Sequence, residues 1–349
     1  MTAPAAETWL KVRPEGLYCV PGDFFIDPLR AVPRAVITHA HADHARPGHG
    51  AVLATAETLA LMRARLGAAA AGASQQAAAL GEPLTLGGVR VWLAPAGHVL
   101  GSAQVAMEYR GRRVAVSGDY KRAADPTCAG FEPLRCDVFV TEATFALPVF
   151  RHPRAGGEIA RLLASLALFP GRSHLIGCYA LGKCQRVIAL LRQAGWQRPI
   201  YLHGALMALC RLYEAFGVPL GDLRPLAGAA KADLAGAIVL APPSAQADRW
   251  SGRLADPVTA LASGWMQVRA RARARGVELP LVISDHADWD ALNATIDETG
   301  AEEVWVTHGA EEALVHAASR RGLRARALRL IGYGEEGGEA DGAADGEAP

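Results

Sequence analysis

Short apolar runs that end in polar residues recur near the beginning and near the end of the chain. These runs are rich in valine, isoleucine and leucine, and their lengths are typical of strands. Strands are predicted at 17–20 and 24–28, on either side of a turn at 21–23, at 35–37, within 84–93 around a turn at 87–88, and at 113–119, 137–142, 281–286 and 303–309. An alanine-rich run at 51–66 is predicted to be helical, whereas 68–80 favours no element.

The middle of the chain follows a different pattern. From about Arg151, apolar runs at 173–178 and 199–204 are each followed by a helical stretch, at 184–191 and 205–216 respectively. A further apolar run follows at 237–243. Alternating strands and helices indicate a parallel sheet covered by helices. We therefore predict a small α/β domain in this part of the chain.

The densest group of potential metal ligands follows the strand predicted at 35–37. His39, His41, Asp43 and His44 fall within six residues. In an extended segment His39 and His41 share one face and can bind one cation, while Asp43 and His44 lie around a bend and can reach a second. Imidazole and carboxylate suit zinc, with manganese or iron as alternatives. The alternative is a scatter of unrelated surface histidines, and the density of ligand types argues against it.

Other polar residues stand near the ends of the remaining predicted strands. They are Asp27, His98, Asp119, Glu142, His286 and His308. Each has an ordinary explanation when taken alone, because a carboxylate after a strand often caps a turn or a helix. Gly97 and Gly101 flank His98 and would allow the backbone to approach a ligand closely.

The string His39-Ala40-His41-Ala42-Asp43-His44 resembles the His-x-His-x-Asp-His signature of the metallo-β-lactamase superfamily. This resemblance implies an α/β fold, namely a four-layer αββα sandwich with a metal site at one edge. His98 matches the next metal ligand of the superfamily, and Asp119 matches the carboxylate that bridges two metal ions. A bridged pair of metal ions suits phosphodiester hydrolysis.

Three later strings resemble the motifs of the β-CASP group, the branch of this superfamily that processes nucleic acids. Glu142-Ala143-Thr144-Phe145 matches the first motif, Asp285-His286 the second and His308-Gly309 the third. The resemblance covers nearly all of 17–333 and is greatest to the bacterial ligase-associated DNA exonucleases. It implies that the α/β domain is inserted at 146–283 and divides the sandwich into 1–145 and 284–334.

The resemblance also implies cofactors and roles. Two zinc ions are expected, with manganese as an alternative. The expected ligands are His39, His41 and His98 for the first ion, Asp43, His44 and His308 for the second, and Asp119 as the bridge. Asp119, Glu142 and His286 would be the catalytic residues, with His286 as a proton donor or a phosphate ligand. Asp27 would orient a ligand histidine.

Composition limits the class of protein further. An apolar content of 51% with 20% charged residues is ordinary for a globular protein, and 349 residues suit two domains. No run resembles a membrane span or a signal peptide, so a cytoplasmic protein without a membrane partner is expected. The six cysteines form no C-x-x-C pair, which favours free thiols over a structural zinc module.

Charge is unevenly distributed along the chain. Six of the 35 acidic residues and none of the 36 basic residues lie in 335–349, a tail that is predicted to be disordered. The rest of the chain therefore carries a basic surplus. Predicted contacts to a nucleic-acid backbone are Lys183, at a strand–helix turn, and Arg269, Arg271, Arg273 and Arg275. An ordinary turn and a solvated charged face are the alternatives. In a strand the four arginines would line one face, and in a helix they would spread.

These observations together predict a metal-dependent phosphodiesterase that acts on nucleic acid. The resemblance favours a DNA exonuclease of DNA repair, with a DNA ligase and a helicase as partners. The first alternative is an RNA-processing nuclease of the same group. The second is a small-molecule metallohydrolase such as a thioesterase, which leaves Glu142, His286 and the inserted domain unexplained. The third is an inactive scaffold subunit, which would typically have lost metal ligands that this chain retains.

Overall fold

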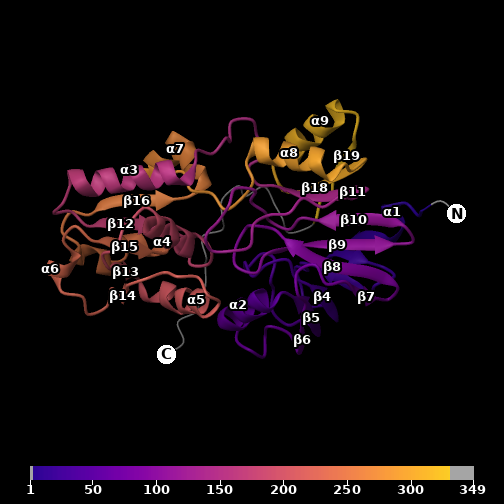
Figure 1. Ribbon diagram of the computed structural model, residues 1–349, viewed down its shortest axis with the longest axis horizontal. Helices are drawn as coiled ribbons and strands as arrows, with labels where there is room; N and C mark the ends of the chain where they lie inside the picture. The colour runs from indigo at the N-terminus through magenta and orange to yellow at the C-terminus, as the bar shows by residue number, and fades with distance from the viewer. Residues whose placement is uncertain (1–2, 331–349) are drawn as a thin grey trace. The chain divides into compact units, whose positions relative to one another are not determined.

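A computed structural model describes residues 3–330, so the predicted acidic tail at 335–349 lies outside the described residues. The chain divides into two compact units (Figure 1). Of the described residues, the first unit comprises 3–151 and 286–330, and the second spans His152–Asp285. The boundaries predicted for the insertion, 146 and 283, stay a prediction.

The first unit contains two sheets. The first sheet has six strands in chain order, antiparallel from β1 to β3 and parallel from β3 to β6. They are β1 (Leu10–Arg13), β2 (Gly16–Cys19), β3 (Phe24–Ile26), β4 (Arg34–Val36), β5 (Ala51–Ala54) and β6 (Ser74–Ala77). Helix α1 (Ala6–Trp9) precedes this sheet, and α2 (Ala56–Leu66) links its last two strands.

The second sheet has seven strands. In spatial order they are β19 (Arg324–Ala327), β18 (Glu303–Gly309), β11 (Val138–Ala143), β10 (Arg112–Val116), β9 (Ala103–Tyr109), β8 (Val89–Pro95) and β7 (Leu84–Leu86). The four strands β10, β11, β18 and β19 are parallel. Because the carboxyl ends of parallel strands meet at one edge of a sheet, the loops after β10, β11 and β18 meet there.

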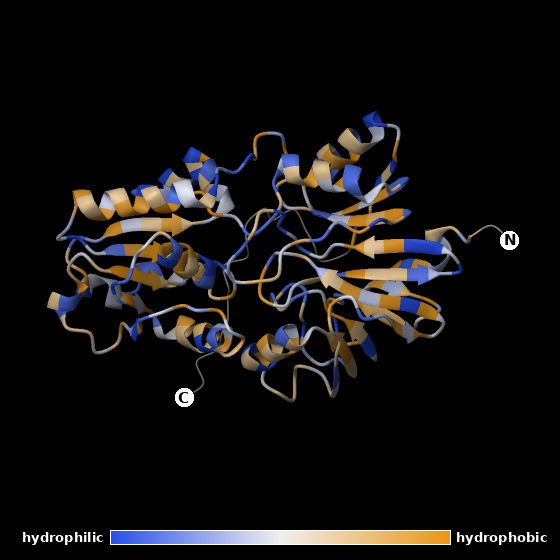
Figure 2. Ribbon diagram, viewed as in Figure 1, coloured by the Kyte–Doolittle hydropathy of each residue, from blue (hydrophilic) through white to orange (hydrophobic). Residues whose placement is uncertain are grey.

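The core of the first unit lies between its two sheets. Phe24 and Val36 of the first sheet and Val105 and Trp305 of the second belong to one cluster of buried residues. On the other face of the second sheet, α8 (Trp289–Thr299) and α9 (Glu311–Arg320) pack against residues such as Phe139. Figure 2 shows β9 and β10 as hydrophobic along most of their length and hydrophilic at their hairpin turn.

The second unit is a parallel sheet with helices. Its strands, in spatial order, are β14 (Leu223–Pro225), β13 (Ile200–Leu202), β15 (Ile238–Ala241), β12 (His174–Gly177), β16 (Val258–Ala262) and β17 (Leu279–Leu281). Its helices are α3 (Ala155–Leu168), α4 (Lys183–Gln193), α5 (Gly204–Ala215), α6 (Lys231–Leu234) and α7 (Arg269–Ala274), with short 3₁₀ turns at Pro243–Ala247, Arg249–Arg253 and Gly264–Gln267. The predicted fold class, a sandwich with an additional parallel α/β domain, is confirmed.

Two local predictions were wrong. Ala51–Ala54 was predicted to be helical but forms β5, because its backbone pairs with β4 on one side and β6 on the other. Thr55 then caps α2 by accepting a hydrogen bond from the Thr58 amide at 3.2 Å. The strand predicted at 281–286 ends at Leu281, so His286 lies in an irregular segment before α8.

Two further features bear on function. The arginine run forms the short helix α7, so its side chains spread around the helix and do not line one face. Within residues 3–330, no helix is both long and apolar enough to cross a membrane.

Candidate metal centre

Four side chains converge near the ends of three strands of the first unit. His39 and His41 follow β4, His98 follows β8 and Asp119 follows β10. His41 Nδ1 lies 3.1 Å from His39 Nε2 and 2.9 Å from His98 Nε2, and Asp119 Oδ2 lies 3.5 Å from His39 Nε2. Nitrogen ligands at ~2.0–2.1 Å from one zinc ion lie ~3.3 Å apart in tetrahedral geometry. The spacing of these atoms therefore fits a single cation.

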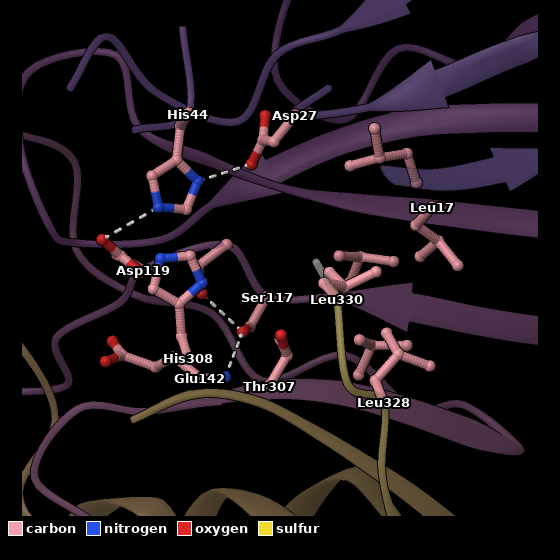
Figure 3. Close-up of a pocket in the computed structure, with 14 residues that line it drawn as sticks. Leu17, Asp27, His44, Ser117, Asp119, Glu142, Thr307, His308, Leu328 and Leu330 are labelled. Carbon is pink, nitrogen blue, oxygen red and sulfur yellow. Dashed lines mark hydrogen bonds and ion pairs between the residues drawn. The ribbon is translucent and has the colours of Figure 1, made fainter. Parts of the chain in front are cut away.

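Asp43, His44 and His308 form a second group of potential ligands. His308 Nε2 lies 3.5 Å and His44 Nε2 3.7 Å from Asp43 Oδ2, and the rings of the two histidines stack with centroids 4.8 Å apart. His44 Nε2 is also 3.3 Å from Asp119 Oδ2 (Figure 3). One oxygen of Asp119 thus approaches histidines of both groups.

The residues present fit a pair of metal ions. Asp119 is 4% exposed, and its second oxygen, Oδ1, is buried and has no hydrogen-bond partner among the residues that the structure describes. A buried carboxylate that is not fully bonded is costly, and a cation is the partner that would compensate it. Imidazole nitrogens combined with carboxylates are the ligands of zinc and similar transition metals. The two groups are consistent with a binuclear metal site.

The pKa values of two histidines of the centre, His39 and His44, are shifted in opposite directions. Burial, together with the charges of His44 and His98, holds the pKa of His39 well below its ordinary value. Burial alone would also lower the pKa of His44, but the carboxylates of Asp119, Asp43 and Asp27 outweigh it and raise that pKa well above its ordinary value. Without metal, these shifts favour the neutral imidazole at His39 and the protonated imidazole at His44.

The carboxylates of the centre stay ionised for the converse reason. Burial tends to raise the pKa of Asp119, but His44 and His286 outweigh this effect, and the pKa of Asp119 lies well below its ordinary value. The pKa of Asp43 is lowered too, mainly because the charge of His44 outweighs burial. The pocket that contains His44 and Asp119 is also lined by apolar side chains, among them Leu17 and Leu328 (Figure 3). Charges interact more strongly next to such an apolar surface.

Asp27 connects the two groups of ligands. It is 6% exposed, and its carboxylate accepts hydrogen bonds from His44 Nδ1 at 2.7 Å, from the Thr38 amide at 2.8 Å and from the Thr38 hydroxyl at 2.6 Å. The Thr38 hydroxyl is also 3.0 Å from His39 Nδ1. Asp27 thereby turns Nε2 of His44 toward Asp119 and bonds to the backbone next to His39; an orienting role for Asp27 stays a prediction.

The loop that carries His98 is held by hydroxyl groups that no sequence motif had indicated. Ser102 Oγ accepts hydrogen bonds from the amides of His98 and Val99 at 3.0 and 3.1 Å. The hydroxyls of Thr55 and Thr58 donate to the Gly101 carbonyl at 2.7 and 3.0 Å. Gly101 has a φ of +73°, and a Cβ atom there would lie 2.7 Å from Thr55 Oγ1, so only glycine fits.

Glu142 and His286 form a pair beside the first group of ligands. Glu142 is buried where the pairing register between β11 and β18 shifts, a feature that re-aims side chains. Its carboxylate lies 3.0 Å from His286 Nδ1 and accepts a hydrogen bond from the Tyr120 amide at 2.8 Å. The ring of His286 lies 4.7 Å from that of His98. Glu142 and His286, together with Asp119, also form a compact group of potential ligands.

The residues predicted to contact nucleic acid differ in their surroundings. Lys183 is fully buried, and its ammonium group bonds to Asp285 Oδ1 at 2.6 Å and to the Ile283 carbonyl at 2.9 Å. The prediction for Lys183 is therefore wrong, because a buried cation in an ion pair does not reach a surface ligand. The four arginines are exposed, and Arg271 lies 4.1 Å over the ring of Trp265; their contact with nucleic acid stays a prediction.

Comparison with known proteins gives relatives of two kinds. No family model matches the chain. The chain is 30% identical over 329 residues, or 90% of its length, to a probable DNA ligase of Opitutus terrae. It is 32% identical over 136 residues (35% of its length) to Endoribonuclease YSH1 of Saccharomyces cerevisiae and 29% identical over 138 residues (37%) to cleavage and polyadenylation specificity factor 73 of Drosophila melanogaster.

The chain is much shorter than these relatives. The alignments cover 30% of the ligase, 17% of the yeast protein and 20% of the fly protein. Among solved structures, a protein of unknown function from Enterococcus faecalis matches with a TM-score of 0.54 at 13% identity, over 78% of this chain and 74% of its own. This last match shows a likeness of fold alone.

Proposed function

The chain is homologous to the β-CASP nucleases of the metallo-β-lactamase superfamily, and from this premise we propose that it is a metal-dependent phosphodiesterase that cleaves nucleic acid. One observation carries the proposal: Asp119 Oδ2 lies 3.3 Å from His44 Nε2 and 3.5 Å from His39 Nε2, so one carboxylate oxygen adjoins both groups of ligands. Two metal ions ~3.5–4 Å apart form a clamp suited to in-line displacement at phosphate.

The ligands would divide between two ions. Those of the first would be His39, His41 and His98, those of the second Asp43, His44 and His308, and Asp119 would be shared. Bound there, zinc or manganese would lower the pKa of a water molecule toward ~7 and offset charge on the phosphate. The residues around the centre keep the ligands in place: Asp27 fixes the orientation of His44, and the Ser102 hydroxyl fixes the loop of His98.

Glu142 and His286 would act on the substrate side. Because His286 Nδ1 is bonded to the Glu142 carboxylate, Nε2 is the nitrogen that can exchange a proton. We assign His286 to protonation of the leaving oxygen or to a hydrogen bond with the phosphate, and Glu142 to orienting its ring. A small-molecule hydrolase would have no need of this pair, and an inactive scaffold would have no need of seven convergent ligands.

Within this class we propose DNA as the substrate, with removal of nucleotides from one end in DNA repair or processing. The relative named a probable DNA ligase aligns with 90% of this chain, whereas the yeast endoribonuclease aligns with 35%. The same relative supports a functional association with a DNA ligase. An RNA-processing nuclease is the second candidate, supported by the homology to the endoribonuclease.

The test uses zinc-loaded protein with end-labelled single-stranded DNA, double-stranded DNA and matched RNA. We expect stepwise shortening of DNA from one end, and loss of this activity in Asp119→Ala. If only RNA is cut, or if the cuts are internal, the second candidate replaces the first. If zinc-loaded protein cuts neither polymer, the proposed function is refuted.

A further inference from the structure

Helix α4 of the second unit begins with two cations that are almost completely buried. Lys183 is 0% and Arg186 is 1% exposed. Lys183 Nζ donates to Asp285 Oδ1 at 2.6 Å and to the Ile283 carbonyl at 2.9 Å, and Arg186 Nη1 donates to the Ser284 carbonyl at 2.8 Å. The first turn of α4 therefore binds three consecutive residues, 283–285.

The place of Lys183 is unfavourable for a cation unless it has a specific partner. Burial of an ammonium group is costly unless the group is paired and hydrogen-bonded. Lys183 is also the first residue of α4, where the helix dipole opposes positive charge. Asp285, which is 3% exposed, compensates both effects with its own buried charge. Replacement of a buried ion pair by apolar side chains of similar volume is often neutral or stabilising, so packing alone does not call for a charged pair here.

The residue that follows Asp285 in the chain is His286. The segment between the end of β17 at Leu281 and the start of α8 at Trp289 is neither helix nor strand, so individual contacts fix its backbone. Asp285 is held by Lys183, and the Ala287 amide donates to the Tyr120 carbonyl at 2.6 Å. The backbone of His286 is thus anchored immediately before and immediately after it.

We propose that the Lys183–Asp285 ion pair is a positioning device for His286. It fixes the backbone from which the imidazole reaches Glu142, and so it acts on the reaction through His286 without touching the substrate. The inference deepens the proposed function and rests on the role given there to His286. It also gives the Gly182-Lys183 turn a function other than binding phosphate.

The test separates positioning from stability with three variants. Lys183→Met deprives the buried Asp285 carboxylate of the ammonium group, and Asp285→Asn deprives Lys183 of its counter-charge. The double variant Lys183→Met/Asp285→Leu removes both charges, and such replacements of buried ion pairs are often neutral or stabilising. Arg192→Met is the matched control. Arg192 lies at the other end of α4, and its guanidinium donates to four backbone carbonyls that are remote from His286 in the sequence.

We expect the double variant to melt close to the wild-type temperature, to retain its zinc and yet to lose kcat by about 10–100-fold, with KM little changed. The limb of the pH–kcat profile that His286→Ala abolishes should shift in the double variant and not in Arg192→Met. Lys183→Arg, which keeps a cation at this position, should have a kcat between those of Lys183→Met and wild type. If the double variant keeps wild-type kcat and pH profile, or if kcat only follows melting temperature across all variants, the pair is merely structural and the proposal is overturned.

A second readout does not depend on nuclease activity. In zinc-loaded protein with ¹⁵N-labelled histidines, the Nδ1 resonance of His286 is identified by its loss in His286→Ala and reports the bond to Glu142. We expect this resonance to shift or broaden in Lys183→Met and Asp285→Asn and to stay unchanged in Arg192→Met. A wild-type protein that cleaves no nucleic acid would refute the proposed function, while an unchanged resonance in both variants would overturn the positioning role.

Discussion

Replacement of Asp27 by asparagine tests how far the centre depends on residues that do not bind metal themselves. Asp27 serves three donors with two oxygens: His44 Nδ1, the Thr38 amide and the Thr38 hydroxyl. Asparagine has one oxygen and one NH₂ group. Whichever way the amide turns, its NH₂ group faces an N–H group, either that of His44 or that of the Thr38 backbone.

Both orientations weaken a metal site. If NH₂ faces His44, the imidazole is driven toward the tautomer with its proton on Nε2, which cannot bind metal. If NH₂ faces the Thr38 amide, the backbone beside His39 is displaced. Loss of such an orienting partner typically costs 10–100-fold in metal affinity, or ~1.4–2.7 kcal/mol. An unsatisfied buried hydrogen-bond donor costs ~1–3 kcal/mol, which overlaps this range of lost binding free energy.

The assay is a competition titration of metal-free protein with zinc and a chromophoric chelator. We expect Asp27→Asn to raise the dissociation constant of at least one of two zinc sites by about 10–100-fold. Asp23→Asn is the matched control. Asp23, like Asp27, has a positive φ, but its carboxylate is exposed and bonds to Tyr18 and Arg34. Wild-type zinc affinity at both sites of Asp27→Asn would refute the reasoning.

Three further predictions follow from the centre and its surroundings. Because the pKa of His44 is raised, zinc must displace the proton of this imidazole when it binds. Zinc affinity should therefore rise ~tenfold per pH unit up to that raised pKa, and protons should be released into a weak buffer on zinc binding. Zinc uptake without proton release would contradict this prediction. Glu142→Gln should still bind two zinc ions and lower the single-turnover rate constant of cleavage by about 10–100-fold. Loss of zinc from this variant would instead indicate that Glu142 is a metal ligand. The double variant Arg269→Gln/Arg273→Gln should bind nucleic acid more weakly, as measured by fluorescence anisotropy. The slope of log affinity against log salt concentration should become shallower by about one for each phosphate that an arginine no longer neutralises. An unchanged slope would show that these arginines do not contact nucleic acid.

The convergence of the candidate metal ligands could be predicted because strand ends gather polar residues at one edge of a sheet. Asp119, Glu142 and His308 follow or end β10, β11 and β18, which are neighbours and parallel. The His39–His44 string also carries two ligand groups within a single turn. Both features can be read from local sequence, and the structure brings these residues together.

The supporting contacts could not be predicted, because they depend on partners that are distant in sequence. Lys183 stands at a turn that suggests phosphate binding, yet it binds Asp285, which lies 102 residues away. Thr55 and Thr58 look like ordinary helix-start residues, and their bond to the Gly101 carbonyl is visible only in the fold. Ala51–Ala54 forms a strand because two neighbouring strands pair with it, whereas its alanine content favours a helix.

The most direct test of the central claim is the activity of metal-free protein as zinc is added back in known amounts. If two ions share Asp119 as proposed, cleavage of end-labelled DNA should rise to a plateau at two zinc ions per chain. Asp119→Ala, given the same zinc, should stay inactive. Full activity with no zinc or with one ion, or an Asp119→Ala protein as active as wild type, would contradict the account.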